Sequence, residues 1–300
     1  MLAWVCNEEI RDRLAPGLEG IEVAAIPARA AQDADVQRVE ALVPPFDDRE
    51  MLGAVLPRMR ALRLIQVLSA GVDWIDGLVP PGVTLCNARG SRDVAVAEWV
   101  VAAILHDAQG LGRADAQRRA RVWDPWTPRE VAGTTALIVG HGAIGRALEP
   151  RLRALEMDVV GVTRSGRNGT RTTRELPDLL SRADVVVLLA PLTDDTRGLA
   201  DAGFLGVMRP GALLVNAGRG ALVDTDALLA ALRSGRLRAA LDVTDPEPLP
   251  PDHPLWEAPG LLLTPHQAGD TERADQRALA IARDQLQRLA RGEPLLNVVG

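Results

Sequence analysis

Three segments of the chain place charged side chains directly after apolar runs that predict β-strands. In ALLVNAGRGALVD, Arg219 stands between two glycines, and LLLTPHQAGD carries His266 just before a glycine turn. The third segment, AALDVTDPEPLP, carries Asp242, Asp245 and Glu247 beyond its apolar run. Ligands of doubly wound sheets bind at the carboxyl ends of strands, so we expect these groups to share one site. An arginine that holds a carboxylate, a histidine that moves a proton and an acid that orients the imidazole suit chemistry on a 2-oxo or 2-hydroxy acid.

A glycine-rich turn predicts a nucleotide cofactor. The segment TALIVGHGAIGRALEPRL spaces Gly140, Gly142 and Gly145 as GxGxxG between an apolar strand and a helix. Such a turn lets the backbone approach a pyrophosphate, which the N–H groups and the positive end of the helix then stabilise. The pattern therefore predicts dinucleotide binding, and His141 lies within the turn.

The second strand of this unit ends without the acid that an NAD site uses. NAD sites place a carboxylate about 20 residues beyond the turn, where it accepts hydrogen bonds from the ribose. In VVGVTRSGR, Thr163 follows Gly145 by 18 residues and occupies that position, beside Arg164, Ser165 and Arg167. Because a guanidinium binds phosphate and a carboxylate repels it, we expect NADP(H) to be preferred, with NAD(H) also able to bind. The alternative is that these arginines are only solvated.

Short apolar strands alternate with amphipathic helices along the chain. This order predicts parallel sheets covered by helices on both faces, and the internal position of the glycine turn requires another α/β domain before it. The spacing of Thr172 and Glu175 predicts a helix start, Gly235 a helix end, and Pro150 falls inside an expected helix. A last helix, near residues 271–291, could pack on either domain. The predicted strands are LAWVC, IEVAAIP, LRLIQVLS, VTLCN, TALIVG, DVVGVT, DVVVLLA, ALLVNA, AALDV and the run before His266.

The composition excludes several kinds of protein. The 300 residues include no lysine and no tyrosine, so all 34 basic residues are arginine. Enzymes that form a lysine Schiff base, P-loop NTPases and dehydrogenases with a Tyr/Lys pair are therefore excluded. A net charge of −6 argues against nucleic-acid or anionic-membrane partners, and the two cysteines lack zinc-ligand spacing, so no metal is expected. Because there is no basic leader and no apolar run long enough to span a bilayer, we expect a cytoplasmic protein.

The ordered motifs of the chain resemble those of the D-isomer-specific 2-hydroxyacid dehydrogenase family. They are QVLSAGVDWID, NARGSRDVAVAEWVVAAIL, LIVGHGAIG, LAPLTDDTRGL, MRPGALLVNAGRGALVD, ALDVTDPEPLPPDHPLW and LLTPHQAGDT. The resemblance implies an α/β homodimer with two doubly wound parallel-sheet domains. A flavodoxin-like substrate domain, residues 1–93 plus 272–300, would be interrupted by a Rossmann cofactor domain, residues 94–271. The implied activity is that of an NAD(P)-dependent oxidoreductase acting on a small 2-oxoacid or D-2-hydroxyacid.

The resemblance also assigns roles to individual residues. Arg219 would be the substrate-binding catalytic arginine, His266 the general acid–base and Glu247 the acid paired with it. Asp242 would contact the nicotinamide carboxamide. The backbone N–H groups of a turn would bind the substrate carboxylate, at Ser69, Ala70 and Gly71. The other cofactor contacts would come from four strand ends: Gly140, Gly142, Ala143, Ile144, Gly145, Thr163, Arg164, Ser165, Ala190, Pro191, Ala217 and Gly218.

With Thr163 in place of the acid, the pattern is most similar to NADP-using glyoxylate and hydroxypyruvate reductases. The leading prediction is therefore reduction of a small 2-oxoacid by NADPH, with a product of D configuration. One alternative is NAD-linked oxidation of a hydroxy acid such as 3-phosphoglycerate, for which Arg89 and Arg92 could hold the phosphate. Another alternative is a nucleotide-sensing corepressor, which binds partner proteins and turns over little substrate. The chain departs from many family members at Gln267–Asp270, which is not a run of small residues.

Overall fold

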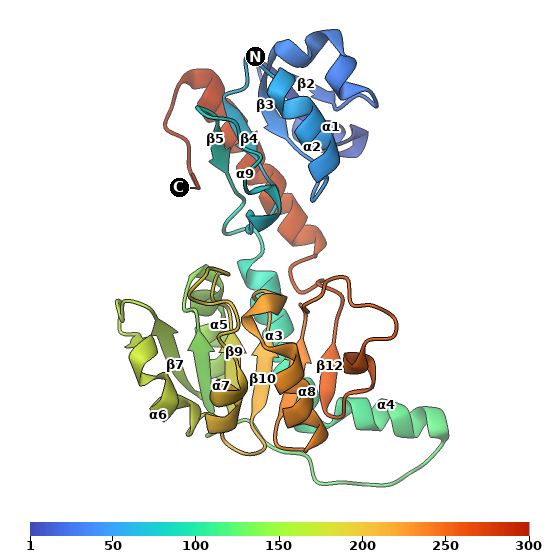
Figure 1. The fold of residues 1–300 in the computed structure, drawn as a ribbon, viewed down its shortest axis with the longest axis vertical. Coiled ribbons are helices and arrows are strands. Elements are labelled where there is room, and N and C mark those ends of the chain that lie inside the picture. The colour runs from blue at the N-terminus through green and yellow to red at the C-terminus, as the bar shows by residue number, and fades with distance from the viewer. Residues whose placement is uncertain (300) are drawn as a thin grey trace. The chain divides into compact units, whose positions relative to one another are not determined.

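The computed structural model describes residues 1–299, and these form two compact units (Figure 1). Unit 1 combines Met1–Arg92 with the C-terminal residues from Asp270 onward, whereas unit 2 is the continuous segment Asp93–Gly269. Each unit is built on one wholly parallel sheet that carries buried apolar clusters on both of its faces. This architecture confirms the predicted fold class of two doubly wound α/β domains.

Unit 1 contains a five-stranded sheet with the order β2-β1-β3-β4-β5. The strands are β1 (Leu2–Val5), β2 (Glu22–Ala25), β3 (Val39–Val43), β4 (Leu64–Gln66) and β5 (Thr84–Cys86). Helix α2 (Arg49–Val55) covers one face, over buried Trp4 and Ile65. Helices α1 (Glu8–Leu14) and α9 (Glu272–Arg291) cover the other face, over Val5 and Leu64. The strand order is that of a flavodoxin-like domain.

The central strand β3 was missing from the predicted strands. Its sequence, VEALV, is short, and Glu40 interrupts the apolar run that would have marked it. In the structure Glu40 is half-buried and pairs with Arg63, with Nη1 and Oε2 3.5 Å apart. The apolar residues around Glu40 are fully buried, so tertiary packing determined this strand more than its local pattern did.

Helix α9 belongs to unit 1, which settles the question that the sequence left open. Thr271 caps its first turn by accepting a hydrogen bond from the Ala274 N–H at 3.2 Å. Its apolar stripe, which includes Leu279 and Leu286, is buried in the same cluster as Val5 and Leu64. The helix thus supplies one layer of a domain whose strands lie more than 180 residues earlier in the sequence, so unit 1 is discontinuous.

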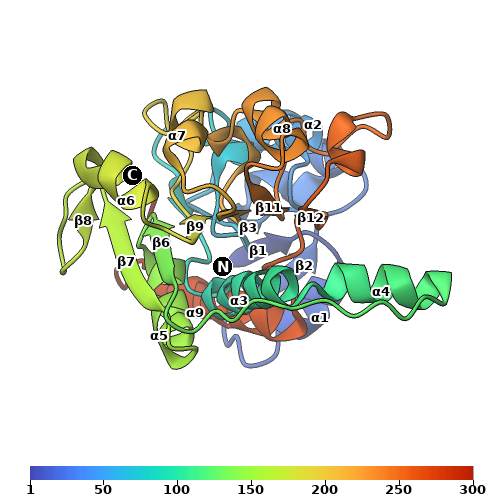
Figure 2. The same ribbon diagram turned by 90° about the horizontal axis from the view of Figure 1, so that it is seen from below.

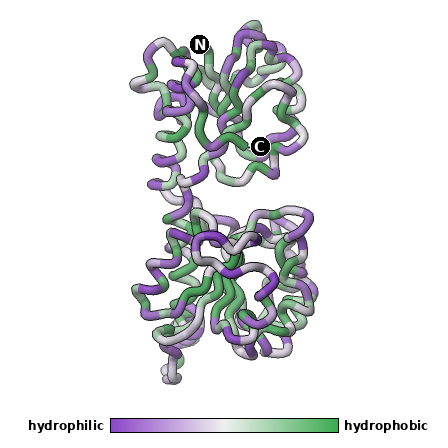
Figure 3. Tube along the Cα trace, turned by 90° about the vertical axis from the view of Figure 1, so that its left-hand side faces the viewer, coloured by the Kyte–Doolittle hydropathy of each residue, from purple (hydrophilic) through white to green (hydrophobic). Residues whose placement is uncertain are grey.

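Unit 2 contains a seven-stranded parallel sheet with the order β12-β11-β10-β9-β6-β7-β8. Its strands are β6 (Thr135–Val139), β7 (Asp158–Thr163), β8 (Arg171–Thr172), β9 (Val185–Leu188), β10 (Leu213–Asn216), β11 (Arg238–Leu241) and β12 (Leu261–Leu263). Its helices are α3 (Asp93–Gln109), α4 (Leu111–Ala120), α5 (Ala143–Ala154), α6 (Leu176–Leu180), α7 (Ala202–Val207) and α8 (Thr225–Arg233). In Figure 3 the strands of this sheet form a hydrophobic centre between more polar segments. The order reverses between β6 and β9, and the carboxyl ends of strands at such a reversal are where nucleotides bind.

Helix α4 carries the basic run GRADAQRRAR and extends away from the rest of unit 2 (Figure 2). None of its residues is buried, and Trp123, just after it, is 96% exposed. Arg118 and Arg119 pair with Asp115 on the same helix, so the run forms an exposed helix surface. Among residues 1–299 no single helix is long and apolar enough to cross a bilayer; α3 and α4 reach that length and composition only as a pair bent by 61°.

The local signals read from the sequence lie where they were expected. Thr172 and Glu175 form a complete capping box before α6, with the Thr172 N–H 2.9 Å from Glu175 Oε2. Gly235 follows α8 with φ of +69°. Pro150 lies inside α5, as the pattern predicted, and the helix continues through it to Ala154.

Candidate active site

His266 lies in an exposed turn directly after β12. Its backbone has φ of +52°, in the left-handed region that a non-glycine residue enters at a cost of about 1–3 kcal/mol. Its backbone N–H donates to the carbonyl oxygen of Asp242 at 2.7 Å, which offsets that cost. The imidazole side chain is 44% exposed, and its Nδ1 is hydrogen-bonded to Oε1 of Glu247. With Nδ1 occupied by a carboxylate, Nε2 is the nitrogen that can exchange a proton with a ligand.

Asp242 organises the turn that carries His266. It follows β11, and only 3% of its surface is exposed. Its Oδ1 accepts hydrogen bonds from the Thr264 hydroxyl at 2.5 Å and from the Gln267 N–H at 2.9 Å, and its Oδ2 accepts from the Ala268 N–H at 2.9 Å. The carboxylate thereby holds a side chain before His266 and the backbone after it. Thr264 was not singled out from the sequence, because its hydroxyl acts only through this folded turn.

Arg219 lies in the turn that follows β10, and a buried asparagine shapes that turn. The side chain of Asn216 donates to the Arg219 carbonyl oxygen at 2.9 Å and accepts from the Gly218 N–H at 3.1 Å. Gly220 is required here, because a Cβ at this position would collide with the backbone of Thr244. The Arg219 guanidinium is half-buried, and its Nη1 donates to the Gly218 carbonyl oxygen at 2.8 Å. Asn216 was missed by sequence reasoning, although it closes the apolar run LLVN.

Arg219, Glu247 and His266 thus follow three strands that are neighbours in the sheet. Strand β11 pairs with β10 on one side and with β12 on the other, and all three strands run parallel. Their carboxyl ends therefore share one edge of unit 2, where the paired His266 and Glu247 side chains lie exposed. This arrangement can bind an anion through a guanidinium and transfer a proton through an imidazole held by a carboxylate.

The glycine turn follows β6 and leads into α5. The N–H groups of Gly140 and His141 donate to Val162 O at 3.0 and 3.2 Å, and that of Gly142 donates to Gly140 O at 2.9 Å. The first N–H groups of α5, at Ala143 and Ile144, precede the first intrahelical hydrogen bond and point out of the helix end. A Cβ at Gly142 would meet no protein atom within 4 Å, so this glycine leaves open space over the backbone instead of permitting internal packing. The turn therefore fits a pyrophosphate.

Other expected cofactor residues stand at the neighbouring strand ends. Ala190 and Pro191 follow β9, which pairs with β6, and Ala217 and Gly218 follow β10. The turn after β9 is stabilised by the Thr196 hydroxyl, which donates to the Pro191 carbonyl oxygen at 2.7 Å. These residues lie on one side of the reversal in strand order, and the glycine turn after β6 lies on the other.

The Thr163 hydroxyl makes hydrogen bonds within the turn after β7. Thr163 Oγ1 accepts from the Gly166 N–H at 3.1 Å and is 2.8 Å from Thr170 Oγ1, so this hydroxyl stabilises the turn itself. Arg164 is 88% exposed, and its Nη1 is 3.5 Å from Asp195 Oδ2. An exposed ion pair of this kind contributes little and can be exchanged for a phosphate contact. Arg164, Ser165 and Arg167 are all exposed, so this turn presents polar groups to the solvent.

Ser69, Ala70 and Gly71 belong to unit 1, where they follow β4. The Ser69 hydroxyl donates to the Gly71 carbonyl oxygen at 2.7 Å, and Asn87 donates to the Ala70 carbonyl oxygen at 2.8 Å. These contacts engage the carbonyl oxygens of the turn and not its N–H groups.

The two arginines considered for phosphate binding are also in unit 1. The Arg92 guanidinium pairs with Asp270, and its Nη2 is 3.5 Å from Asp275 Oδ1. Two carboxylates therefore already compensate the charge of Arg92. Only Arg89 remains a candidate, because its backbone, and not its guanidinium, makes the hydrogen bonds to Asn87 and Asn297.

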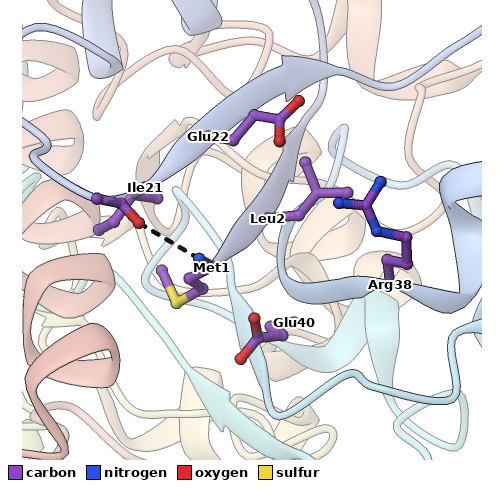
Figure 4. A pocket seen from close by; sticks show the side chains of 7 residues that line it. Met1, Leu2, Ile21, Glu22, Arg38 and Glu40 are labelled. Carbon is purple, nitrogen blue, oxygen red and sulfur yellow. Dashed lines mark hydrogen bonds between the residues drawn. The ribbon is translucent and has the colours of Figure 1, made fainter.

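Two cavities lie at the amino ends of the strands, whereas the predicted site residues follow the carboxyl ends. One, of about 490 Å³, is at the amino ends of β1 and β2 in unit 1 and is lined by polar groups that include Glu22, Arg38 and Glu40 (Figure 4). The other, of about 310 Å³, is at the amino ends of β9, β10 and β11 in unit 2. There Arg238 and Arg129 both pair with Asp107. Since ligands of doubly wound sheets bind at the carboxyl ends, neither cavity is the candidate site.

Comparison with known proteins agrees with this geometry. A family model described as D-isomer specific 2-hydroxyacid dehydrogenase, NAD binding domain, matches residues 101–268. A glyoxylate reductase of Aeropyrum pernix is 35% identical over 82% of this chain and 78% of its own. A D-3-phosphoglycerate dehydrogenase of Methanocaldococcus jannaschii is 32% identical over 82% of this chain, but the match spans only 49% of that longer protein. The crystal structure of an NADPH-dependent glyoxylate/hydroxypyruvate reductase from Sinorhizobium meliloti, with NADP and sulfate, has a TM-score of 0.85 and 29% identity over 99% of this chain and 98% of its own.

Proposed function

This chain belongs to the D-isomer specific 2-hydroxyacid dehydrogenase family, and we propose that it reduces a small 2-oxoacid such as glyoxylate or hydroxypyruvate with NADPH. The observation that carries the proposal is the pair formed by His266 and Glu247, on strand ends adjacent to the one that carries Arg219. The glyoxylate reductase and the NADPH-dependent reductase to which the chain is similar support this substrate class. The D-3-phosphoglycerate dehydrogenase relatives define the alternative substrate.

In the proposed reaction, NADPH bound at the glycine turn supplies the hydride that the carbonyl carbon accepts. Arg219 binds the substrate carboxylate and polarises the carbonyl oxygen through its N–H groups. His266, as imidazolium, donates the proton from Nε2 to that oxygen, and Glu247 keeps the ring oriented through Nδ1. One hydride and one proton are added to the 2-oxoacid, so the product is a 2-hydroxyacid, for which we propose D configuration. The backbone N–H groups of Ser69, Ala70 and Gly71 belong to the proposal as further carboxylate contacts.

The function is tested with purified full-length protein, NADPH or NADH, and a panel of 2-oxoacids with 3-phosphoglycerate and NAD as a separate arm. Loss of nicotinamide absorbance with glyoxylate or hydroxypyruvate supports the proposal. Turnover of 3-phosphoglycerate alone would favour the phosphoglycerate dehydrogenase alternative. The pairing of Arg92 with Asp270 and Asp275 argues against that alternative, because Arg92 was one of the two candidates for binding the phosphate. Nucleotide binding without turnover of any acid would instead indicate a sensor.

The cofactor preference rests on the turn after β7, where we propose that Arg164 and Ser165 contact the 2′-phosphate of NADP(H). Replacing Arg164 with alanine is expected to lower kcat/KM for NADPH by about 10- to 100-fold, the worth of one charge-assisted hydrogen bond, and to leave that for NADH unchanged. Steady-state kinetics with both cofactors measure the difference. Arg182→Ala is the matched control, because Arg182 is exposed just before the amino end of β9. Equal losses with both cofactors would contradict the assignment.

Asp242 has two proposed roles that one variant separates. The family resemblance assigns it to the nicotinamide carboxamide, whereas its three accepted hydrogen bonds favour positioning of the His266 turn. Asp242→Asn replaces one acceptor by a donor, so a backbone N–H beside His266 loses its partner. We expect kcat to fall about 10- to 100-fold with little change in the Kd of NADPH, measured by nucleotide fluorescence. A large rise in Kd with normal kcat would instead favour the carboxamide contact.

A homodimer and a cytoplasmic location complete the proposal. Both follow from the family resemblance and the composition. The exposed apolar residues around α4, Leu111, Val122 and Trp123, are a surface that a second copy could cover.

A further inference from the structure

His141, the residue between the first two glycines of the turn, has a side chain that points into the protein. Its imidazole is only 10% exposed, and its Nε2 is 2.8 Å from Oε2 of Glu149, which lies two turns along α5. Glu149 Oε1 in turn accepts from Arg153 Nε at 3.0 Å and Nη2 at 2.9 Å. Arg153 Nη2 also donates to the Val159 carbonyl oxygen of β7 at 3.2 Å. A continuous polar chain therefore joins the glycine turn, the helix after it and the next strand.

The ionised state of Glu149 is favoured by this chain. Burial alone would oppose ionisation, yet the hydrogen bonds from Arg153 and His141 hold the pKa of the Glu149 carboxyl below its usual value. An ionised Glu149 carboxylate, bonded to both Arg153 and His141, holds the imidazole in one orientation more firmly than a neutral carboxyl group would.

Gly161 on β7 provides the space that the imidazole occupies. A Cβ at this position would lie 2.7 Å from Cδ2 and 2.8 Å from Cγ of His141, closer than real Cβ contacts occur. Gly161 does not adopt a positive φ, so its backbone does not require glycine. The absence of a side chain in the middle of a strand, which weakens the strand, is explained by the ring that packs there.

We propose that His141 and Glu149 are positioning residues that hold the glycine turn in the geometry that binds the cofactor pyrophosphate. This inference rests on the proposed function, because it assigns the turn to NADP(H). The imidazole holds the turn on its protein side, through the ring contact with Gly161 and the hydrogen bond to Glu149. The Ala143 and Ile144 N–H groups are thereby kept aligned toward the ligand. Since the turn binds the cofactor and not the oxoacid, its loosening affects cofactor affinity and not the chemical step.

The test measures the Kd of NADPH by fluorescence titration, together with kcat at saturating NADPH, for four variants of the full chain. His141→Ala is expected to raise the Kd about 3- to 10-fold, the worth of one hydrogen bond, with kcat at saturation unchanged. His141→Gln keeps a donor toward Glu149 and is expected to restore much of the affinity. Gly161→Ala is expected to weaken binding because it displaces the ring. The double variant of His141→Ala and Gly161→Ala is expected to bind no more weakly than His141→Ala alone, since the added methyl then fills vacated space.

The outcomes separate this inference from the proposed function. If the unmodified protein binds neither NADPH nor NADH, the proposed function fails, and the inference fails with it. If the unmodified protein binds NADPH and His141→Ala binds it equally well, only the inference is overturned. It is also overturned if the losses from His141→Ala and Gly161→Ala add, or if kcat falls while the Kd stays constant. Thermal unfolding of each variant identifies any that is not folded, and His141→Gln then decides the question.

Discussion

Replacing His266 with alanine is expected to lower kcat on glyoxylate or hydroxypyruvate by about 10²- to 10⁴-fold. The reason is that the carbonyl oxygen then takes its proton from water, in place of an imidazole that Glu247 orients through Nδ1. The variant is expected to fold normally, because the His266 side chain is exposed, and alanine tolerates its left-handed backbone at modest cost. The measurement is kcat at saturating NADPH and oxoacid, with the Kd of NADPH as an independent check on folding of the cofactor site.

The control for this variant is His106→Ala. His106 lies on α3, far in sequence from the three strand ends, so turnover is expected to stay close to that of the unmodified protein. Turnover by His266→Ala within a few-fold of normal would remove His266 from the mechanism. A loss of the same size in His106→Ala would show that general destabilisation, and not proton transfer, explains the result.

Arg219→Lys is expected to lower kcat/KM for the oxoacid by about 10²- to 10³-fold, although the charge is kept. A guanidinium presents two parallel N–H groups to a carboxylate and further N–H groups to the carbonyl oxygen, whereas an ammonium is a single point charge. The turn itself is held by Asn216 and the neighbouring glycines, so its backbone is expected to survive the change. Steady-state kinetics with varied oxoacid at saturating NADPH measure the loss.

Arg233→Lys serves as the matched control for Arg219→Lys, because Arg233 is exposed in the last turn of α8. Its kcat/KM is expected to be unchanged. A normal kcat/KM in Arg219→Lys would mean that charge alone is sufficient at this position, and the bidentate contact would have to be abandoned.

The sequence predicted the fold class well because apolar strands and capping residues report on local structure. The strands before Arg219, Asp242 and His266 could all be located from runs such as ALLVNA and LLLT, and their parallel pairing places their ends together. Strand β3 was missed because Glu40 interrupts its short apolar run, and the partner that accommodates Glu40, Arg63, lies just before another strand, β4.

The details of the site were harder to predict, because hydrogen bonds between distant segments determine them. The position of Thr163 was found from spacing, but its hydroxyl is used within the turn by Gly166 and Thr170. Asn216 and Thr264 carry no motif, and their importance follows only from the turns that they hold. The packing of the His141 ring against Gly161 also joins residues 20 positions apart, one in the turn after β6 and one within β7, and periodicity does not reveal such a contact.

The discontinuity of unit 1 has a consequence for the order in which the chain is made. A ribosome delivers residues 1–92 before unit 2, yet α9, which with α1 covers the face of their sheet with Val5 and Leu64, is synthesised only after unit 2. Unit 2 is continuous and emerges in full before that helix does. Strands β1 to β5 therefore have one apolar face without α9 until unit 2 has been synthesised. A nascent chain that stalls after Gly269 would expose that face to chaperones or to other nascent chains.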